Sequence, residues 1–215
     1  MTRWTSRIVT IASLLIAAPL GPGHAAFAQS GAGGGQATYT PADAQFMTGM
    51  IAHHAQAVLI AGWAPTHGAS PSILTLCERI VAGQGDEIEL MQRWLADHNE
   101  PVPDGKAHYM SGMSAMNHDM AGMDHGSGMP GMLSQEQLAQ LDAARGPEFD
   151  RLFLTFMIQH HQGAIVMVDR LFGAQGAGEE ERSFRFASDV YADQTTEIDR
   201  MQKMLAALPP SGSGQ

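Results

Sequence analysis

The sequence predicts an all-α protein, a four-helix bundle made from two duplicated helical hairpins that a long crossover joins. Two observations carry this prediction. Apolar residues recur at helical spacing between clear start and stop signals, and no segment alternates apolar and polar residues as a strand does. The chain also repeats itself: MTGMIAHHAQA, residues 47–57, returns as LTFMIQHHQGA at residues 154–164.

The first hairpin has strong local signals. Its first helix begins with Thr40 as N-cap, Pro41 in the first turn and Asp43 three residues after the cap, and we expect it to run to about Trp63. The segment APTHGAS then interrupts the helical pattern. A second helix begins at Ser70-Pro71 and ends near HNEPVPDG.

The second hairpin follows the same plan. Its first helix is expected over residues 149–172, and its second opens with Glu179 to Glu181 and stops before Pro209. A shorter amphipathic helix, SQEQLAQLDAAR, precedes this hairpin with Ser134 and Gln137 as a capping box.

The repeat extends over both helices of each hairpin, at an offset of 107 residues that a short insertion raises to 110. Each copy reads Met-x-x-His-His on the first helix and Gln-x-x-Glu-Ile-x-x-Met on the second. The matched pairs include Met50 with Met157, His53 with His160, His54 with His161, Gln84 with Gln194, Glu87 with Glu197, and Met91 with Met201. A period this long indicates a duplicated hairpin, and the roughly 50 residues between the copies match the crossover of ferritin-like bundles.

The N-terminus has the pattern of a secretory signal peptide. Arg3 and Arg7 precede the apolar run IVTIASLLIAAPL, and AFA gives a cleavage site after Ala28. We therefore expect a periplasmic or secreted protein without stable membrane insertion. The expected organisation is a signal peptide at 1–28, a Gly-rich lead-in at 29–39, the duplicated domain at 40–207 with the crossover at 98–133, and a tail at 208–215.

Charge and cysteine content limit the partners and the kinds of site that the protein can have. Without Arg3 and Arg7 the chain has 10 basic and 22 acidic residues, a formal charge of −12 that repels nucleic acid and anionic lipid but tolerates cations. The single cysteine, Cys77, excludes an internal disulfide. Its place between Ile73 and Val81 favours a small buried hydrophobic residue over a metal ligand.

The histidine pairs allow two interpretations. They could be buried polar groups that bond to Glu87 and Glu197, or they could bind a metal together with the mirrored methionines. Because neighbouring helical residues diverge by about 100°, we expect one histidine of each pair to face inward and the other a seam between helices. The pairs are expected to meet across the core, through His53 and His160 or through His54 and His161.

The donor types favour copper if a metal is present. The Glu-x-x-His motif of di-iron bundles is absent, whereas imidazole with thioether suits Cu(I) or Ag(I), and Glu87 and Glu197 would orient the imidazoles. Zinc would fit the histidines but leaves the methionines unexplained. From the reference imidazole pKa of about 6.5, we expect acid to release histidine-bound copper near that pH. The candidate ligands in the bundle are Met50, His53, His54, Met157, His160, His161, Met91, Met201 and Met47.

The crossover supplies a second group of soft ligands. From Met110 to Met132 it contains no Leu, Ile, Val or Phe, so its thioethers have no apolar face to join and we expect the segment to be flexible. Sulfurs that cannot pack are best explained as ligands for a soft ion. The auxiliary candidates are Met110, Met113, Met116, His118, Met120, Met123 and His125.

These motifs resemble a known bacterial family, the domain of unknown function 305. The similarity rests on FMTGMIAHHAQAV, on GMLSQEQLAQLDAARGPEFDRLFLTFMIQHHQGAIVM and on QTTEIDRMQKML, and it spans about residues 40–207. The resemblance implies an exported ferritin-like bundle, copper binding as in some members, and metal-site roles for Met50, His53, His54, Met157, His160 and His161. Met47 has Leu154 as its counterpart, so the two halves are not identical.

The function predicted from the sequence is an exported protein, not an enzyme, that buffers, sequesters or carries Cu(I), with Ag(I) as an analogue, in metal tolerance or homeostasis. Its partners would be the metal ion and other exported copper-handling proteins. Two alternatives stay open: a copper-dependent oxidase, which needs an open coordination position, and a metal-free structural or interaction bundle. The sequence leaves stoichiometry, oligomeric state and the choice between buffering and delivery undetermined.

Overall fold

The computed structural model describes residues 38–107 and 129–209, and this part of the chain contains helices and no strand. The all-α prediction is therefore confirmed. The predicted signal peptide, the tail from residue 210 and the crossover at 108–128 lie outside the described residues. The helices are α1 (Pro41–Ala61), the 3-10 helix η1 (Ala64–Thr66), α2 (Pro71–Asp97), α4 (Gln135–Ala143), α5 (Pro147–Gly173) and α6 (Glu181–Ala207).

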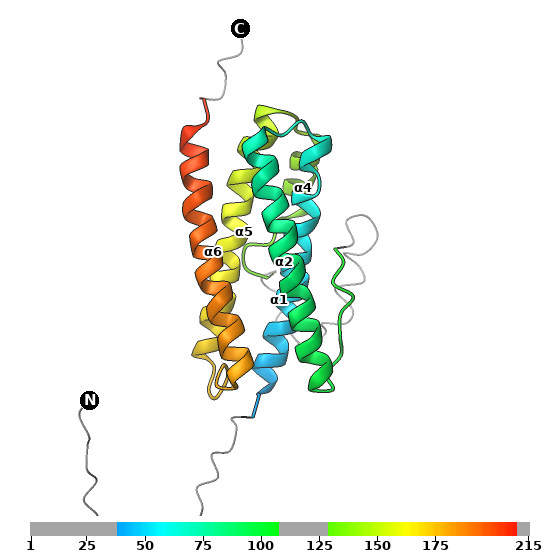
Figure 1. The fold of residues 1–215 in the computed structure, drawn as a ribbon, viewed down its shortest axis with the longest axis vertical. Coiled ribbons are helices and arrows are strands. Elements are labelled where there is room, and N and C mark those ends of the chain that lie inside the picture. Colours follow the sequence, from blue (N-terminus) through cyan, green and yellow to red (C-terminus); the bar gives the residue numbers. More distant parts are fainter. Residues whose placement is uncertain (1–37, 108–128, 210–215) are drawn as a thin grey trace, which may run out of the picture. The chain divides into compact units, whose positions relative to one another are not determined.

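Four long helices form the predicted bundle of two hairpins. Helix α1 packs on α2, α5 packs on α6, and the hairpins meet where α1 contacts α5 (Figure 1). The short α4 packs against α5. None of the helices within residues 38–107 and 129–209 has the length and apolar character of a membrane span.

The helix bounds differ slightly from the sequence prediction. Helix α1 ends at Ala61, two residues earlier than expected, because the 3-10 turn at Ala64–Thr66 takes over the chain there. Helix α5 begins at Pro147, two residues earlier than expected, since proline is well suited to the first turn. The predicted capping box of α4 is confirmed: Gln137 N donates to Ser134 Oγ (3.2 Å) and Ser134 N donates to Gln137 Oε1 (2.9 Å).

Two buried aspartates join the hairpins crosswise. Asp43 in α1 caps its own helix through Thr40 N (2.8 Å), and it also accepts from Gly178 N (2.8 Å) and from Ser183 Oγ (2.5 Å) at the start of α6. Its repeat counterpart, Asp150 in α5, accepts from Ser70 N (3.1 Å) at the start of α2. Each hairpin thus anchors one helix start of the other.

The core is divided along the bundle into two apolar clusters. On α1, the buried apolar residues up to Ala55 belong to one cluster and those from Ala57 onward belong to the other. On α5 the order is reversed, with the change between Met157 and Ala164. Helices α1 and α5 therefore run antiparallel, and the histidine pairs occupy a layer between the two clusters. We call His53, His54, His160 and His161 the histidine layer.

Candidate metal centre

The histidine layer is fully buried, with all four side chains at 0% exposure. His53 of α1 and His160 of α5 lie against one another, with ring centroids 3.8 Å apart and planes inclined by 37°. The prediction that the pairs meet across the core is confirmed for His53 with His160. The repeat explains this contact, because the pseudo-two-fold axis between α1 and α5 brings equivalent positions together.

The other histidine of each pair faces the second helix of its own hairpin. His54 Nε2 lies 2.6 Å from Glu87 Oε2 on α2, and His161 Nε2 lies 2.7 Å from Glu197 Oε2 on α6. Both carboxylates are 16% exposed at their side chains, so they reach the edge of the core while the rings stay inside it. The two contacts are equivalent in the two hairpins, as the repeated Glu positions predict.

A third hydrogen bond comes from the crossover. His53 Nε2 lies 3.0 Å from the carbonyl oxygen of Pro130. This contact could not be predicted from the sequence, since Pro130 lies 77 positions from His53 in the chain. It also corrects the expectation of a flexible crossover for its last residues, 129–133, which we call the strap.

Two glycines allow the strap to approach α5. Gly131 has φ +75°, and a Cβ there would lie 2.6 Å from Gln159 O and 2.8 Å from His160 O. A Cβ on Gly163 would lie 2.6 Å from Gly131 Cα and would overlap the Pro130 carbonyl. The backbone can therefore reach the histidine layer only because both positions lack side chains.

The strap is also tied to α1. Leu133 N donates to Gln56 Oε1 (2.8 Å), and Gln56 Nε2 donates to Leu133 O (3.3 Å). Gln56 is the repeat counterpart of Gly163. In the first hairpin this position holds Leu133 through two hydrogen bonds, and in the second it lets the backbone of Pro130 and Gly131 pack on α5. The strap is thus held to α1 by hydrogen bonds and packed against α5 by its glycine contact.

These bonds determine the imidazole tautomers. A carbonyl can only accept, so His53 carries its proton on Nε2, and an ionised Glu87 or Glu197 likewise requires an Nε2–H on its histidine. The Nδ1 atoms of His53, His54 and His161 then have free lone pairs. Within the described residues these three Nδ1 atoms, together with both ring nitrogens of His160, are buried without a hydrogen-bond partner.

Burial keeps the inner histidines neutral. Desolvation, reinforced by the neighbouring His54, lowers the pKa of His53 to about 3. Desolvation, with the charges of the other histidines, lowers the pKa of His160 well below 6.5. The reference pKa of 6.5 therefore does not apply to these two rings in the metal-free protein, because that value belongs to a solvated imidazole. The release of histidine-bound copper by acid stays a prediction.

The candidate methionines flank the layer in two groups. Met47, Met50 and Met91 belong to one apolar cluster, whereas Met157 and Met201 belong to the other, and all five side chains are fully buried. The structure thus places the thioethers on both sides of the histidines and does not gather them in one place. The auxiliary candidates from Met110 to His125 lie outside the described residues.

Two glutamines that are not among the predicted site residues complete the polar interior. Gln84 on α2 and Gln194 on α6 are 3% and 2% exposed, and each lies one turn before its glutamate. Both amide atoms of Gln84 and the Oε1 of Gln194 have no hydrogen-bond partner among the described residues. Their matched positions in the repeat were the signal that could have identified them.

The orphaned nitrogens fit a metal ligand set. A metal-binding histidine normally donates its other N–H to a carboxylate or a backbone carbonyl, which is the arrangement of His54, His161 and His53. In the described part of the chain, however, no three His, Cys, Asp or Glu side chains are arranged to hold an ion as they stand. The rings of His53 and His160 lie against one another with their centroids 3.8 Å apart, so they would have to turn before they shared an ion.

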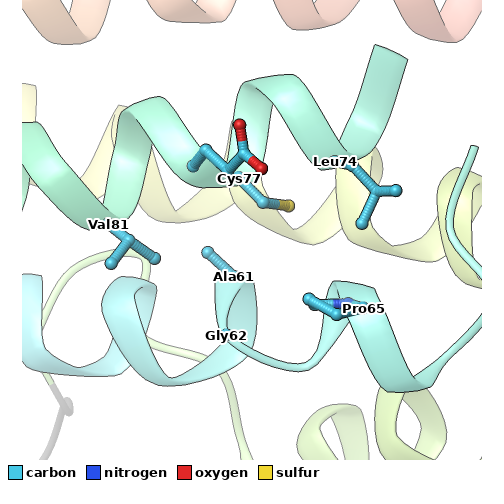
Figure 2. Close-up of a pocket in the computed structure, with 7 residues that line it drawn as sticks. Ala61, Gly62, Pro65, Leu74, Cys77 and Val81 are labelled. Carbon is cyan, nitrogen blue, oxygen red and sulfur yellow. The ribbon is translucent and has the colours of Figure 1, made fainter. Parts of the chain in front are cut away.

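Cys77 is separate from this site. It lines an apolar hollow of about 140 Å³ between α2 and the end of α1, together with Ala61, Pro65, Leu74 and Val81 (Figure 2). The side chain is 3% exposed, and burial is the main cause that raises its pKa to about 12. A buried neutral thiol agrees with the expected role as a small hydrophobic residue.

Residues 43–205 match the family described as "Domain of unknown function (DUF305)". A DUF305 fragment from Deinococcus radiodurans has a similar fold, with a TM-score of 0.62 and 26% identity; the match covers 79% of this chain and 99% of that one. A DUF305 protein from Streptomyces coelicolor matches with a TM-score of 0.60 and 25% identity, over 77% of this chain and 91% of that one. No curated protein is similar enough to match the chain.

The protein CopM is also similar. Its Cu(II)-bound form matches with a TM-score of 0.57 and 27% identity, over 76% of this chain and 95% of that one. CopM has also been solved in Cu(I)-bound, silver-bound and apo forms.

Proposed function

Because the chain belongs to the DUF305 family, which its match over residues 43–205 establishes, we propose that it is a copper-binding protein that buffers or carries Cu(I), with Ag(I) as an analogue. One observation carries the proposal: four buried histidines meet in one layer, and their Nδ1 atoms have no hydrogen-bond partner among the described residues. Leaving several buried polar atoms unpaired costs about 1–3 kcal/mol each, and an ion would remove that cost.

The ligands proposed for the ion are the Nδ1 atoms of His54 and His161, with His53 and His160 as further imidazole donors. Glu87, Glu197 and the Pro130 carbonyl would hold the opposite ring nitrogens and so keep the Nδ1 lone pairs directed inward. The pKa values of His53 and His160 support this role, since neutral rings accept a cation without first losing a proton.

Cu(I) is preferred to harder ions because of the flanking sulfurs. Thioether and imidazole together suit Cu(I), whereas zinc would gain nothing from Met50, Met91, Met157 and Met201. The silver-bound form of CopM supports a soft ion for a related fold. The methionines of the crossover, from Met110 to Met123, are proposed as an auxiliary store for the same ion.

Export belongs to the same proposal. The basic leader and AFA cleavage site suit a periplasmic or secreted protein, where thioethers bind Cu(I) without competing protons. Binding without catalysis, and exchange of copper with other exported proteins, complete the proposed role.

Anaerobic titration of the mature chain with Cu(I) against a competing chelator tests the proposal. We expect tight binding that the double variant His54→Ala/His161→Ala weakens strongly. The matched control is His98→Ala, since His98 stacks on Trp94 outside the layer. Equal copper affinity in all three proteins would contradict the proposal, as would a mature chain that takes up no copper.

A further inference from the structure

Two methionines outside the candidate ligand set lie close together where the strap joins the bundle. Met129 Sδ is 3.7 Å, and the Met167 methyl carbon is 3.3 Å, from the point that a Cβ on Gly49 would occupy. Gly49 lies one turn before His53 on α1. Met167 lies one turn after Gly163 on α5, where the Pro130 carbonyl approaches. Both methionine side chains therefore lie against the same glycine, one turn from the histidine layer.

We propose that Met129 and Met167 form an outer two-thioether site for Cu(I) or Ag(I), from which the ion passes to His53 and His160. This inference rests on the proposed function of the histidine layer. It assigns an uptake site to one methionine of the strap and one of α5, neither of which is among the candidate ligands predicted from the sequence.

Exposure supports an uptake role. The histidine layer is fully buried, whereas Met129 and Met167 are both half-buried and so have one side toward solvent. Met129 also directly precedes Pro130, whose carbonyl holds His53. An ion at the two sulfurs would thus be one residue away from the contact that orients an inner ligand.

The chemistry of the pair suits the ion. Thioethers are soft ligands without a proton to lose, so they capture Cu(I) or Ag(I) at any pH at which the protein folds. Gly49 keeps the space between them open, because a Cβ there would crowd the Met167 methyl group. Packing alone gives a different expectation: methionine that only fills space is replaced by leucine with little effect.

The test uses the mature full-length chain with methyl-13C-methionine and Ag(I) or Cu(I) as the probe. The variants are Met129→Leu/Met167→Leu, which removes both sulfurs, and Gly49→Ala, which keeps them but places a methyl group between them. Met204→Leu is the matched control, since Met204 is a half-buried methionine of α6 that packs on the other cluster.

We expect substoichiometric Ag(I) to shift the methyl resonances of Met129 and Met167 in the wild-type protein. Stopped-flow loading of the histidine layer with Cu(I) should slow about tenfold in the double leucine variant, the change that a loss of roughly 1.4 kcal/mol gives. Gly49→Ala should also slow loading, and Met204→Leu should not. The final amount of histidine-bound copper should be the same in all four proteins.

Normal loading rates in both variants, or methyl signals of Met129 and Met167 that Ag(I) leaves unchanged, would overturn the outer site while the histidine layer still filled. A histidine layer that takes up no ion even in the wild-type protein would overturn the outer site together with the proposed function. The two failures are therefore distinguishable.

Discussion

At the scale of single residues, the histidine layer depends on which ring nitrogen carries the proton. His54 and His161 each place Nε2 against a carboxylate, and His53 places Nε2 against a backbone carbonyl. All three acceptors therefore select the same tautomer and leave Nδ1 as the lone-pair donor. Without such an acceptor a buried imidazole can carry its proton on Nδ1, and that N–H group cannot bind a cation.

Removing the carboxylates should weaken copper binding without touching a ligand atom. We expect Glu87→Ala and Glu197→Ala each to reduce Cu(I) affinity about 10- to 100-fold, the usual effect of losing a hydrogen-bond partner behind a ligand. Chelator competition measures this change. The matched control is Glu89→Ala on the same helix, whose side chain is 67% exposed and pairs with Arg93. Equal affinities for Glu87→Ala and Glu89→Ala would show that the pairing with His54 is unimportant.

Acid should destabilise the metal-free protein through His53 and His160. Unfolded imidazoles bind protons below about pH 6.5, whereas folded His53 does so only near pH 3, so the unfolded state gains protons first. The stability contributed by the neutral rings is complete above pH 6.5 and is lost as the pH falls toward 3. We expect the free energy of unfolding to drop by about 1.4 kcal/mol per pH unit for each ring.

Urea unfolding of metal-free protein between about pH 6 and about pH 5 measures this slope, in a window above the pKa values of ordinary carboxylates. The variant His160→Gln should reduce the slope by half. A stability that stays level over this window would mean that the rings are protonated in the folded state or reach solvent.

At the scale of elements, the strap can pack on α5 only because Gly163 has no side chain, and one methyl group there would displace it. We expect Gly163→Ala to destabilise the protein by about 1–3 kcal/mol, since a Cβ would overlap the Pro130 carbonyl and the strap would have to move. Copper affinity should fall with it, because His53 loses the acceptor at Nε2. Thermal unfolding and Cu(I) competition measure the two effects.

Gly83→Ala on α2 is the matched control for this substitution. Nothing lies within 4 Å of a Cβ at Gly83, and alanine favours a helix interior by about 0.5–1 kcal/mol over glycine. The control should therefore be neutral or stabilising, with normal copper binding. If Gly163→Ala behaved in the same way, the close packing of the strap would be irrelevant to the site.

The elements also show which features a sequence can reveal. The caps at Thr40 and Ser134 were predictable because a cap is decided within four residues. The strap was not predictable, since its contacts join residues 77 positions apart, such as Gln56 with Leu133. The sequence predicts that the sulfur of Met129 is unpacked, like those of the other crossover methionines. The fold instead places Met129 against Gly49.

At the scale of the whole domain, the duplication made both the fold and the site visible in advance. Matched helices must pack as equivalent hairpins, and residues near the pseudo-two-fold axis must meet, as His53 and His160 do. The repeat shows which positions differ between the copies but not what each difference does in the fold. Gly163 replaces Gln56, and the strap binds only one of the two inner histidines, so the symmetry of the sequence overstates that of the site.

The bundle should fold without the Met-rich part of the crossover. Residues 110–126 contain no Leu, Ile, Val or Phe, whereas the helices of both hairpins supply buried apolar residues to both clusters. Deleting residues 110–126 should leave helical circular dichroism and cooperative melting nearly unchanged, while the number of Cu(I) ions bound per chain falls. A molten product without a cooperative transition would show that this segment belongs to the core.

The proposed copper site requires that the histidines of the histidine layer bind the metal through Nδ1. Imidazole 15N NMR of the mature chain lacking residues 110–126, recorded before and after one equivalent of Ag(I), tests this most directly. We predict that the Nδ1 resonances of His54 and His161 shift on binding while their Nε2 atoms keep their protons and their bonds to Glu87 and Glu197. Silver-dependent shifts at Nε2, or histidine resonances that silver leaves unchanged, would contradict the account.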